Sequence, residues 1–112
     1  MNSELISKAK CTIEEKKELL ELVATIVGIA KIARQHGLLS LLEDMGSIKN
    51  KLLKIALKFR IDGFYPPDVE KIIMNMINLG DYSGRELLEK LVVFTGASFS
   101  FSVGERQLKI KI

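Results

Sequence analysis

The feature that most constrains the fold is a long apolar stretch with helical periodicity near the N-terminus. Between Leu19 and Ala33, apolar residues recur at positions 19, 20, 22, 23, 26, 27, 30 and 33, a spacing that favours an α-helix. Thr12 and Glu15 have the spacing of a capping box, which predicts that the helix begins near Thr12. The apolar residues cover a wider surface than one amphipathic stripe. We therefore expect this helix to be central to a bundle or paired with a second chain.

The residues that follow indicate where this helix ends and where the next ones begin. Gly37 predicts the end of the first helix, because glycine takes the left-handed cap conformation without a steric penalty. Leu38 begins a second helical region, and Gly46 with Ser47 predicts a break in it. Ser47 is the expected N-cap of the next helix, IKNKLLKIALKF, over residues 48–59.

The middle of the chain carries turn and helix signals as well. The segment DGFYPPD predicts a turn, since Asp62 and Gly63 tolerate a positive φ and proline favours the first turn of a following helix. That helix is expected over residues 67–79. Ser83 and Glu86 form a second potential capping box, which predicts a fourth helix that ends near residue 95.

The C-terminal segment changes period. Apolar residues alternate first with serines and then with lysines around the polar sequence GERQ, which is typical of a β-hairpin. We therefore expect a mainly α fold, a small bundle of about four helices with a C-terminal β-hairpin, in a single domain over residues 1–112. Its helical part is expected at 12–95 and its hairpin at 98–112. The alternating apolar residues are Phe99, Phe101, Val103, Leu108, Ile110 and Ile112.

Composition and charge exclude several classes of function. The net charge of +3 is too small to make nucleic acid the default partner. One cysteine, Cys11, and one histidine, His36, do not make a disulfide or a zinc set, so neither a metal nor a cofactor is expected. No apolar stretch reaches the roughly 20 residues of a membrane helix, and the N-terminus lacks the apolar run of a signal peptide. We expect a cytoplasmic protein.

No group of residues predicts catalysis. His36 could act as a base for Ser40, but a histidine near a helix C-terminus is better explained by its interaction with the helix dipole. Glu43 and Asp44 are adjacent, so on a helix they point in different directions. The turn chemistry already explains Asp62. The sequence therefore predicts a binding protein and not an enzyme.

The clearest charged feature is a basic stripe on the helix expected over residues 48–59. Lys51, Lys54 and Lys58 follow one another at helical spacing on a face away from the apolar residues. The stripe could bind phosphates, an acidic protein or anionic headgroups. The more frequent explanation of such a stripe is the solvated face that any surface helix presents.

The order of motifs IAKIARQHGLLSLLED and FRIDGFYPPDVEKII, over about residues 30–73, resembles the cytoplasmic region of the flagellar motor stator A-subunit (MotA-type) family. In that family a helix that leaves the membrane carries alanine and arginine before a Gly-Leu-Leu and a glutamate, and a later helix ends in Asp-Gly. The resemblance implies a cytoplasmic interaction module that docks on a partner through charged helix faces, with Arg34, Lys51, Lys54 and Lys58 as candidate interaction residues. The positions that match the family motif are Gly37, Leu38, Leu39, Glu43, Asp62 and Gly63.

Three functions remain open from the sequence. The first is a non-enzymatic protein-protein interaction module of the stator type, without a membrane span in this chain but with a possible membrane-complex partner. The second is a self-assembling helical domain, either a homo-oligomer or a subunit of a larger complex, suggested by the wide apolar helix. The third and weakest is nucleic-acid binding through the basic stripe and the hairpin residues Arg106, Lys109 and Lys111, which the lack of tryptophan disfavours.

Overall fold

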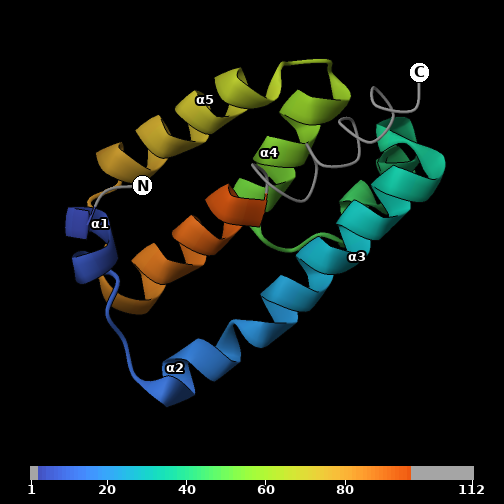
Figure 1. Cartoon of the computed structure of the whole chain (residues 1–112). Coiled ribbons are helices and arrows are strands. Elements are labelled where there is room, and N and C mark those ends of the chain that lie inside the picture. Colours follow the sequence, from blue (N-terminus) through green and yellow to red (C-terminus); the bar gives the residue numbers. More distant parts are fainter. Residues whose placement is uncertain (1–2, 97–112) are drawn as a thin grey trace.

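The computed structural model describes residues 3–96 of the chain, and helices dominate this part (Figure 1). A last helix spans residues 84–96 of the described part. The others are α1 (Ser3–Lys8), α2 (Ile13–Glu18), α3 (Leu20–His36), the 3-10 helix η1 (Leu38–Ser47), α4 (Lys51–Ile61) and α5 (Pro66–Leu79).

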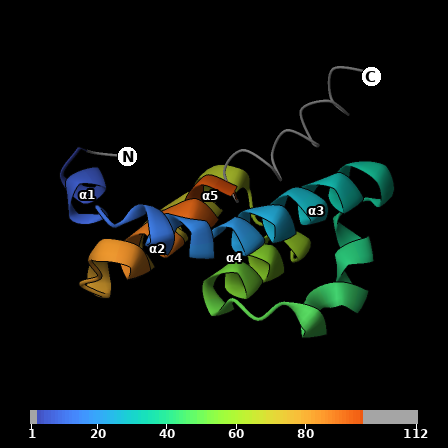
Figure 2. The same cartoon turned by 90° about the horizontal axis from the view of Figure 1, so that it is seen from below.

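The helix over 84–96 returns alongside α5 in the opposite direction, and α2 with α3 runs beside it in the same direction (Figure 1). The view from below places α1 at one end of the molecule and η1 with the end of α3 at the other (Figure 2). An ion pair between Glu18 and Arg85 and a close approach of Ile26 to Gly96 mark two points along the parallel pair.

The long N-terminal helix predicted from Thr12 to Gly37 is interrupted. The predicted capping box is present, since Glu15 N–H donates to Thr12 Oγ1 and Thr12 N–H donates to the Glu15 carboxylate. α2 nevertheless ends at Glu18, and Leu19, which is buried, separates it from α3. α1 was not predicted. The C-terminus of α3 was predicted correctly, because Gly37 caps it with a φ of 84°.

The segment between α3 and α4 differs from the prediction in two ways. Residues Leu38–Ser47 form a 3-10 helix instead of an α-helix. Ser47 is not the N-cap of α4, because its hydroxyl donates to the Asp44 carbonyl. The cap is Asn50, whose side-chain oxygen accepts from Leu53 N–H at 3.0 Å, so α4 begins three residues later than predicted.

The turn after α4 and the start of α5 agree with the prediction. Gly63 has a φ of 95°, and α5 begins with Pro66 in its first turn. Arg60 is buried although it is charged, and its guanidinium donates to the Phe64 carbonyl. This hydrogen bond stabilises the turn between α4 and α5, since a buried guanidinium without a hydrogen bond would cost free energy.

The fold class predicted from the sequence has to be corrected. Residues 3–96 contain no β-strand, so the described structure is mainly helical and the C-terminal hairpin component is withdrawn. The segment assigned to that hairpin, 98–112, lies outside the described residues.

The hydrophobic core is formed by buried side chains of α3, η1, α4, α5 and the helix over 84–96. Complete burial of an aliphatic side chain contributes about 1.5–3 kcal/mol, so these helices hold most of the stabilising contacts. The apolar surface of α3 is only partly buried: Ile26, Ile29 and Ala30 are in the core, but Leu20, Val23 and Val27 are exposed. The most deeply buried side chains are Leu41, Leu53, Leu57, Val69, Ile73, Ile77, Leu87 and Val93.

Candidate functional site

An apolar groove of about 600 Å³ lies between α3 and the helix over residues 84–96, with α1 and α2 contributing to its edge. Its volume falls within the range of about 300–1,000 Å³ that is typical of ligand pockets. The lining residues are Ile6, Ala9, Lys10, Lys16, Val23, Ile26, Val27, Leu88, Leu91, Val92, Thr95 and Gly96.

The groove follows from the spacing of residues on its two long walls. Leu88, Leu91, Val92 and Thr95 lie at i, i+3, i+4 and i+7, and therefore share one face of their helix. The opposite wall repeats the start of this pattern on α3, where Val23 is followed by Ile26 and Val27. Two such stripes side by side form an elongated apolar trough.

The floor of the groove is closed where the two helices touch. A Cβ atom on Gly96 would lie 2.7 Å from Ile26 Cγ2, so the helices approach as closely as they do only because residue 96 has no side chain. Ile26 and Leu91 are each only 4% exposed. They belong both to the core and to the floor of the groove.

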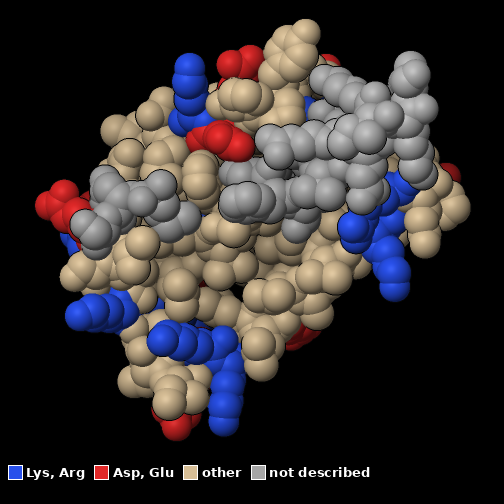
Figure 3. Space-filling view, viewed as in Figure 1, with Lys and Arg blue, Asp and Glu red and all other residues tan. Residues whose placement is uncertain are grey.

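The rim of the groove, in contrast, is open to solvent. Val23 is 41% exposed, Val27 54% and Ile6 55%. Large aliphatic side chains that lie together on a surface at this exposure mark an interaction site more often than isolated ones do. Figure 3 shows uncharged surface between the blue side chains (lysine and arginine) near α2 and those near the C-terminal end of α3.

The charges at the rim have one sign. Lys10 and Lys16 are exposed and line the groove, and no carboxylate among the described residues lines it with them. Neither lysine makes an ion pair with any residue in the described part of the chain. The groove is thus apolar inside and positive at one end.

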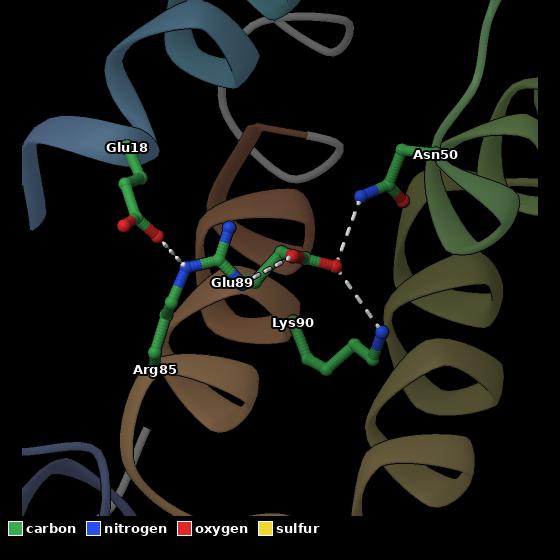
Figure 4. Close-up of polar contacts among 5 residues, drawn as sticks. All are labelled: Glu18, Asn50, Arg85, Glu89 and Lys90. Atoms are coloured by element: carbon green, nitrogen blue, oxygen red, sulfur yellow. Dashed lines mark hydrogen bonds and ion pairs between the residues drawn. The ribbon is translucent and has the colours of Figure 1, made fainter. Parts of the chain in front are cut away.

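A second, polar hollow of about 510 Å³ lies beside the same two helices. Figure 4 shows the polar contacts of Arg85 and Glu89 at this hollow. Arg85 Nε lies 2.6 Å from a Glu18 oxygen, and Arg85 Nη1 lies 3.6 Å from Glu89. Glu89 also accepts from Asn50 Nδ2 at 3.2 Å and from Lys90 Nζ at 3.3 Å. These contacts connect α2, the start of α4 and the helix over 84–96.

The polar network is suited to positioning helices. Each carboxylate faces a cation, and the asparagine amide that bonds Glu89 comes from the residue that caps α4. Arg85 is also the last of the groups that hold the pKa of Glu15 below its usual value of 4.5, after the Thr12 amide and hydroxyl. Within residues 3–96, no three His, Cys, Asp or Glu side chains gather as a metal site would require.

The candidate interaction residues predicted from the sequence are exposed but lie away from both hollows. Lys51, Lys54 and Lys58 share the outer face of α4, opposite the buried face that includes Leu53 and Leu57. Arg34 is exposed in the last turn of α3. None of the four lines the groove or the polar hollow.

The positions of the stator-type motif fall at two connections between helices. Gly37 caps α3, and Leu38, Leu39 and Glu43 lie in η1, where Leu39 and Glu43 are exposed. Asp62 and Gly63 form the exposed turn between α4 and α5. Local backbone requirements already account for both glycines, because each has a positive φ.

The sequence analysis missed the groove and the polar network. The spacing of Leu88, Leu91 and Val92 was visible in the sequence, but it does not reveal which helix stands opposite. Ile6 and Ala9 were missed because α1 was not predicted, and the pairing of Glu18 with Arg85 joins residues that are distant in the chain.

No helix among the described residues has both the length and the apolar character needed to cross a bilayer. The chain matches no protein-family model, no curated protein and no solved structure. The likeness to the stator family therefore stays a prediction.

Proposed function

We propose that this chain is a non-enzymatic protein-protein interaction module and that a helix of a partner protein binds in the apolar groove. The observation that carries the proposal is the pair of facing aliphatic stripes whose rim, at Val23, Val27 and Ile6, is open to solvent. Burying this rim would remove apolar surface from water, which is the main driving force of protein association.

The shape of the groove favours a helix as the occupant. A helix presents side chains at i, i+3, i+4 and i+7 along one face, and amphipathic helices bind in grooves through such anchors. Leu88 and Thr95 lie seven residues apart on the groove wall, about 10 Å at the helical rise of 1.5 Å per residue. A partner helix with the same stripe would complete a three-helix arrangement with α3 and the helix over 84–96.

Self-assembly is the second candidate, and exposed apolar side chains outside the groove favour it. Leu39 is 69% exposed, Tyr65 73% and Leu79 87%. Light scattering over a concentration series tests this candidate, with a dimer that persists at high salt as the expected result, because salt does not screen apolar burial. A monomer at all concentrations would contradict self-assembly.

The stator-type interpretation is a more specific form of the first proposal. It places the protein in the cytoplasm and assigns docking on a membrane complex to the exposed cations Arg34, Lys51, Lys54 and Lys58. The basic stripe of Lys51, Lys54 and Lys58 lies on α4, which does not line the groove. Variants of these lysines therefore test the stator-type interpretation separately from the groove.

Calorimetric titration with a neutral amphipathic peptide tests the groove. The peptide would have about 14 residues, roughly four helical turns, with leucine at the anchor positions and glutamine and alanine elsewhere. We expect binding with a negative heat-capacity change, the marker of apolar burial. Val27→Gln should weaken it, and Ala24→Gln, an exposed α3 position outside the groove lining, should not.

The same titration can contradict the proposal in two ways. Absence of binding to the wild-type protein would exclude a helix-binding groove. Binding that survives Val27→Gln but is lost when Lys51, Lys54 and Lys58 are all changed to glutamine would move the interaction site to α4.

A further inference from the structure

We infer that the partner helix is acidic, with carboxylates that flank its apolar stripe at the end that lies over Lys10 and Lys16. This inference rests on the proposed function and adds the chemistry by which the groove selects among amphipathic helices. An apolar trough alone binds any such helix, so selection must come from its polar edge.

The edge carries the required charge. Lys10 and Lys16 are the charged residues among the groove-lining side chains, and both are exposed. A lysine can lay its aliphatic stem along an apolar surface and keep its ammonium group in water. The two side chains can therefore line the trough and still meet a charge on a helix that lies in it.

The cations of the polar network around Glu89 show the contrast. Arg85 pairs with Glu18 and Glu89, and Lys90 pairs with Glu89. Lys10 and Lys16 have no carboxylate partner among the described residues, although Glu14, Glu15 and Glu18 lie in the same α2 region. The two ammonium groups can therefore pair with carboxylates of a bound partner.

The lysines also define one end of the groove. Lys16 belongs to α2 and Lys10 to the connection between α1 and α2, whereas Thr95 and Gly96 lie at the C-terminal end of the helix over 84–96. Among the groove-lining residues, positive charge therefore lies near one end only. An acidic helix gains attraction there, and a basic helix meets like charges, which is costly at an interface.

The experiment compares two labelled peptides by fluorescence anisotropy with the full chain. Both have about 14 residues and identical leucine positions; the flanking residues are glutamates in one peptide and lysines in the other. We expect the glutamate peptide to bind on the order of tenfold more tightly or better at low salt, because rim charges act through complementarity. Raising the salt from about 0.05 M to about 0.5 M should reduce the preference, since screening shortens the range of the charges.

Charge-reversal variants identify the lysines responsible. Lys10→Glu with Lys16→Glu should reverse the preference between the two peptides. The matched control is Lys51→Glu with Lys54→Glu, which changes the net charge equally but at α4, away from the groove. The control should keep the preference for the glutamate peptide.

The outcomes separate this inference from the proposed function. If both peptides bind equally and Val27→Gln weakens both, the groove binds helices but the acidic partner is wrong. If the control variant reverses the preference as strongly as the groove variant, net charge and not the rim explains it, and the inference fails. A salt-resistant dimer that Val27→Gln dissociates would make a second copy the occupant, which also overturns the acidic partner. If neither peptide binds, both the inference and the proposed function fail.

Discussion

Two hollows lie beside the helix over residues 84–96, and residues of α2 and α3 line both of them. One is lined by paired charges and the other by exposed apolar side chains. In the polar hollow Arg85 pairs with Glu18 on α2 and, along its own helix, with Glu89, and Asn50, the N-cap of α4, donates a hydrogen bond to Glu89. In the apolar groove Val23 and Val27 face solvent. In the first, the ion pairs of Arg85 join residues of the same chain; in the second, apolar side chains at the rim stay in contact with solvent.

The comparison separates positioning from stability. Arg85 and Glu18 have side chains that are 35% and 58% exposed, and ion pairs at such exposure contribute little stability because water and salt screen them. The floor of the groove contributes more, since Ile26 and Leu91 are almost completely buried. The polar side therefore orients the helices, the groove floor holds them together, and the groove rim remains available for binding.

The largest expected effect separates floor from rim within the groove. Leu91→Ala should lower the free energy of unfolding by about 2–5 kcal/mol, because it leaves a cavity in a packed site. Val27→Ala, at a side chain that is 54% exposed, should change it by less than about 0.5 kcal/mol. Urea unfolding measures both. Equal effects would mean that the rim is packed as tightly as the floor, and the groove would not exist.

The next prediction concerns the close contact that sets the floor. Gly96→Ala should destabilise the protein by about 1–3 kcal/mol, because the new methyl group would overlap Ile26 and force the helices apart. Gly28→Ala in α3 is the matched control, since nothing lies within 4 Å of its Cβ position. It should stabilise by about 0.5–1 kcal/mol, the helix-propensity gain of alanine over glycine.

Thermal unfolding of the two alanine variants gives opposite shifts if the contact is as described. Ile26→Val in the Gly96→Ala background should recover part of the loss, because it removes a methyl group from the crowded side chain. A stabilising Gly96→Ala would show that the two helices are not in contact at this point.

A smaller effect tests the polar side at the start of α4. Asn50→Ala should cost about 1 kcal/mol, because it removes the N-cap bond to Leu53 N–H together with the bond to Glu89. Ser47→Ala should cost less, since its hydroxyl bonds the Asp44 carbonyl and caps no α-helix. Chemical denaturation of both variants is the measurement. A larger loss for Ser47→Ala would restore the cap that the sequence predicted.

That misassigned cap shows what local sequence determines and what it does not. Capping signals that need only neighbouring residues were predicted well: the Thr12 box, the Gly37 cap and the turn at Gly63. Ser47 and Asn50 are both good N-cap residues. Packing decided between them, because starting α4 at Lys51 places Leu52 and Leu53 in the core.

The candidate site could be predicted only in part for the same reason. The wide apolar surface of α3 was visible in the sequence, and the structure shows that Leu20, Val23 and Val27 are the part left exposed. The break at Leu19 and the short α1 could not be predicted from periodicity, because tertiary burial of Leu19 and Ala9 stabilises them. The polar network joins residues from three separate helices, so no spacing along the chain reveals it.

The ion pair of the polar hollow gives a weaker effect that depends on salt. A double-mutant cycle with Glu18→Gln and Arg85→Gln should give a coupling energy of about 0.2–1 kcal/mol at low salt. The coupling should shrink at about 0.5 M NaCl, where the Debye length is only a few ångströms. The loss of unfolding free energy in Leu91→Ala should not depend on salt in this way, because the contacts at the groove floor are apolar. A coupling that resists salt would mean that the pair is shielded from water.

The smallest expected effect is the pH dependence of the α2 cap, which Arg85 also influences. The Thr12 amide, the Thr12 hydroxyl and the Arg85 charge, in that order, hold the pKa of Glu15 below 4.5. Because folding lowers this pKa, the carboxylate stabilises the folded state fully above pH 4.5, its value without these contacts. The contribution is lost as the pH falls through the lowered pKa of the folded protein.

Glu15→Gln isolates this contribution, since glutamine keeps a hydrogen-bonding side chain but carries no charge. The difference in unfolding free energy between the wild-type protein and Glu15→Gln should be constant above pH 4.5 and shrink at lower pH. An NMR titration of the Glu15 carboxyl should show the pKa rising partway towards its usual value in Thr12→Ala, because the amide donor remains, and rising less in Arg85→Gln, whose charge acts last and from farther along the chain. An equal or larger rise in Arg85→Gln would mean that the polar hollow, and not the capping box, controls the start of α2.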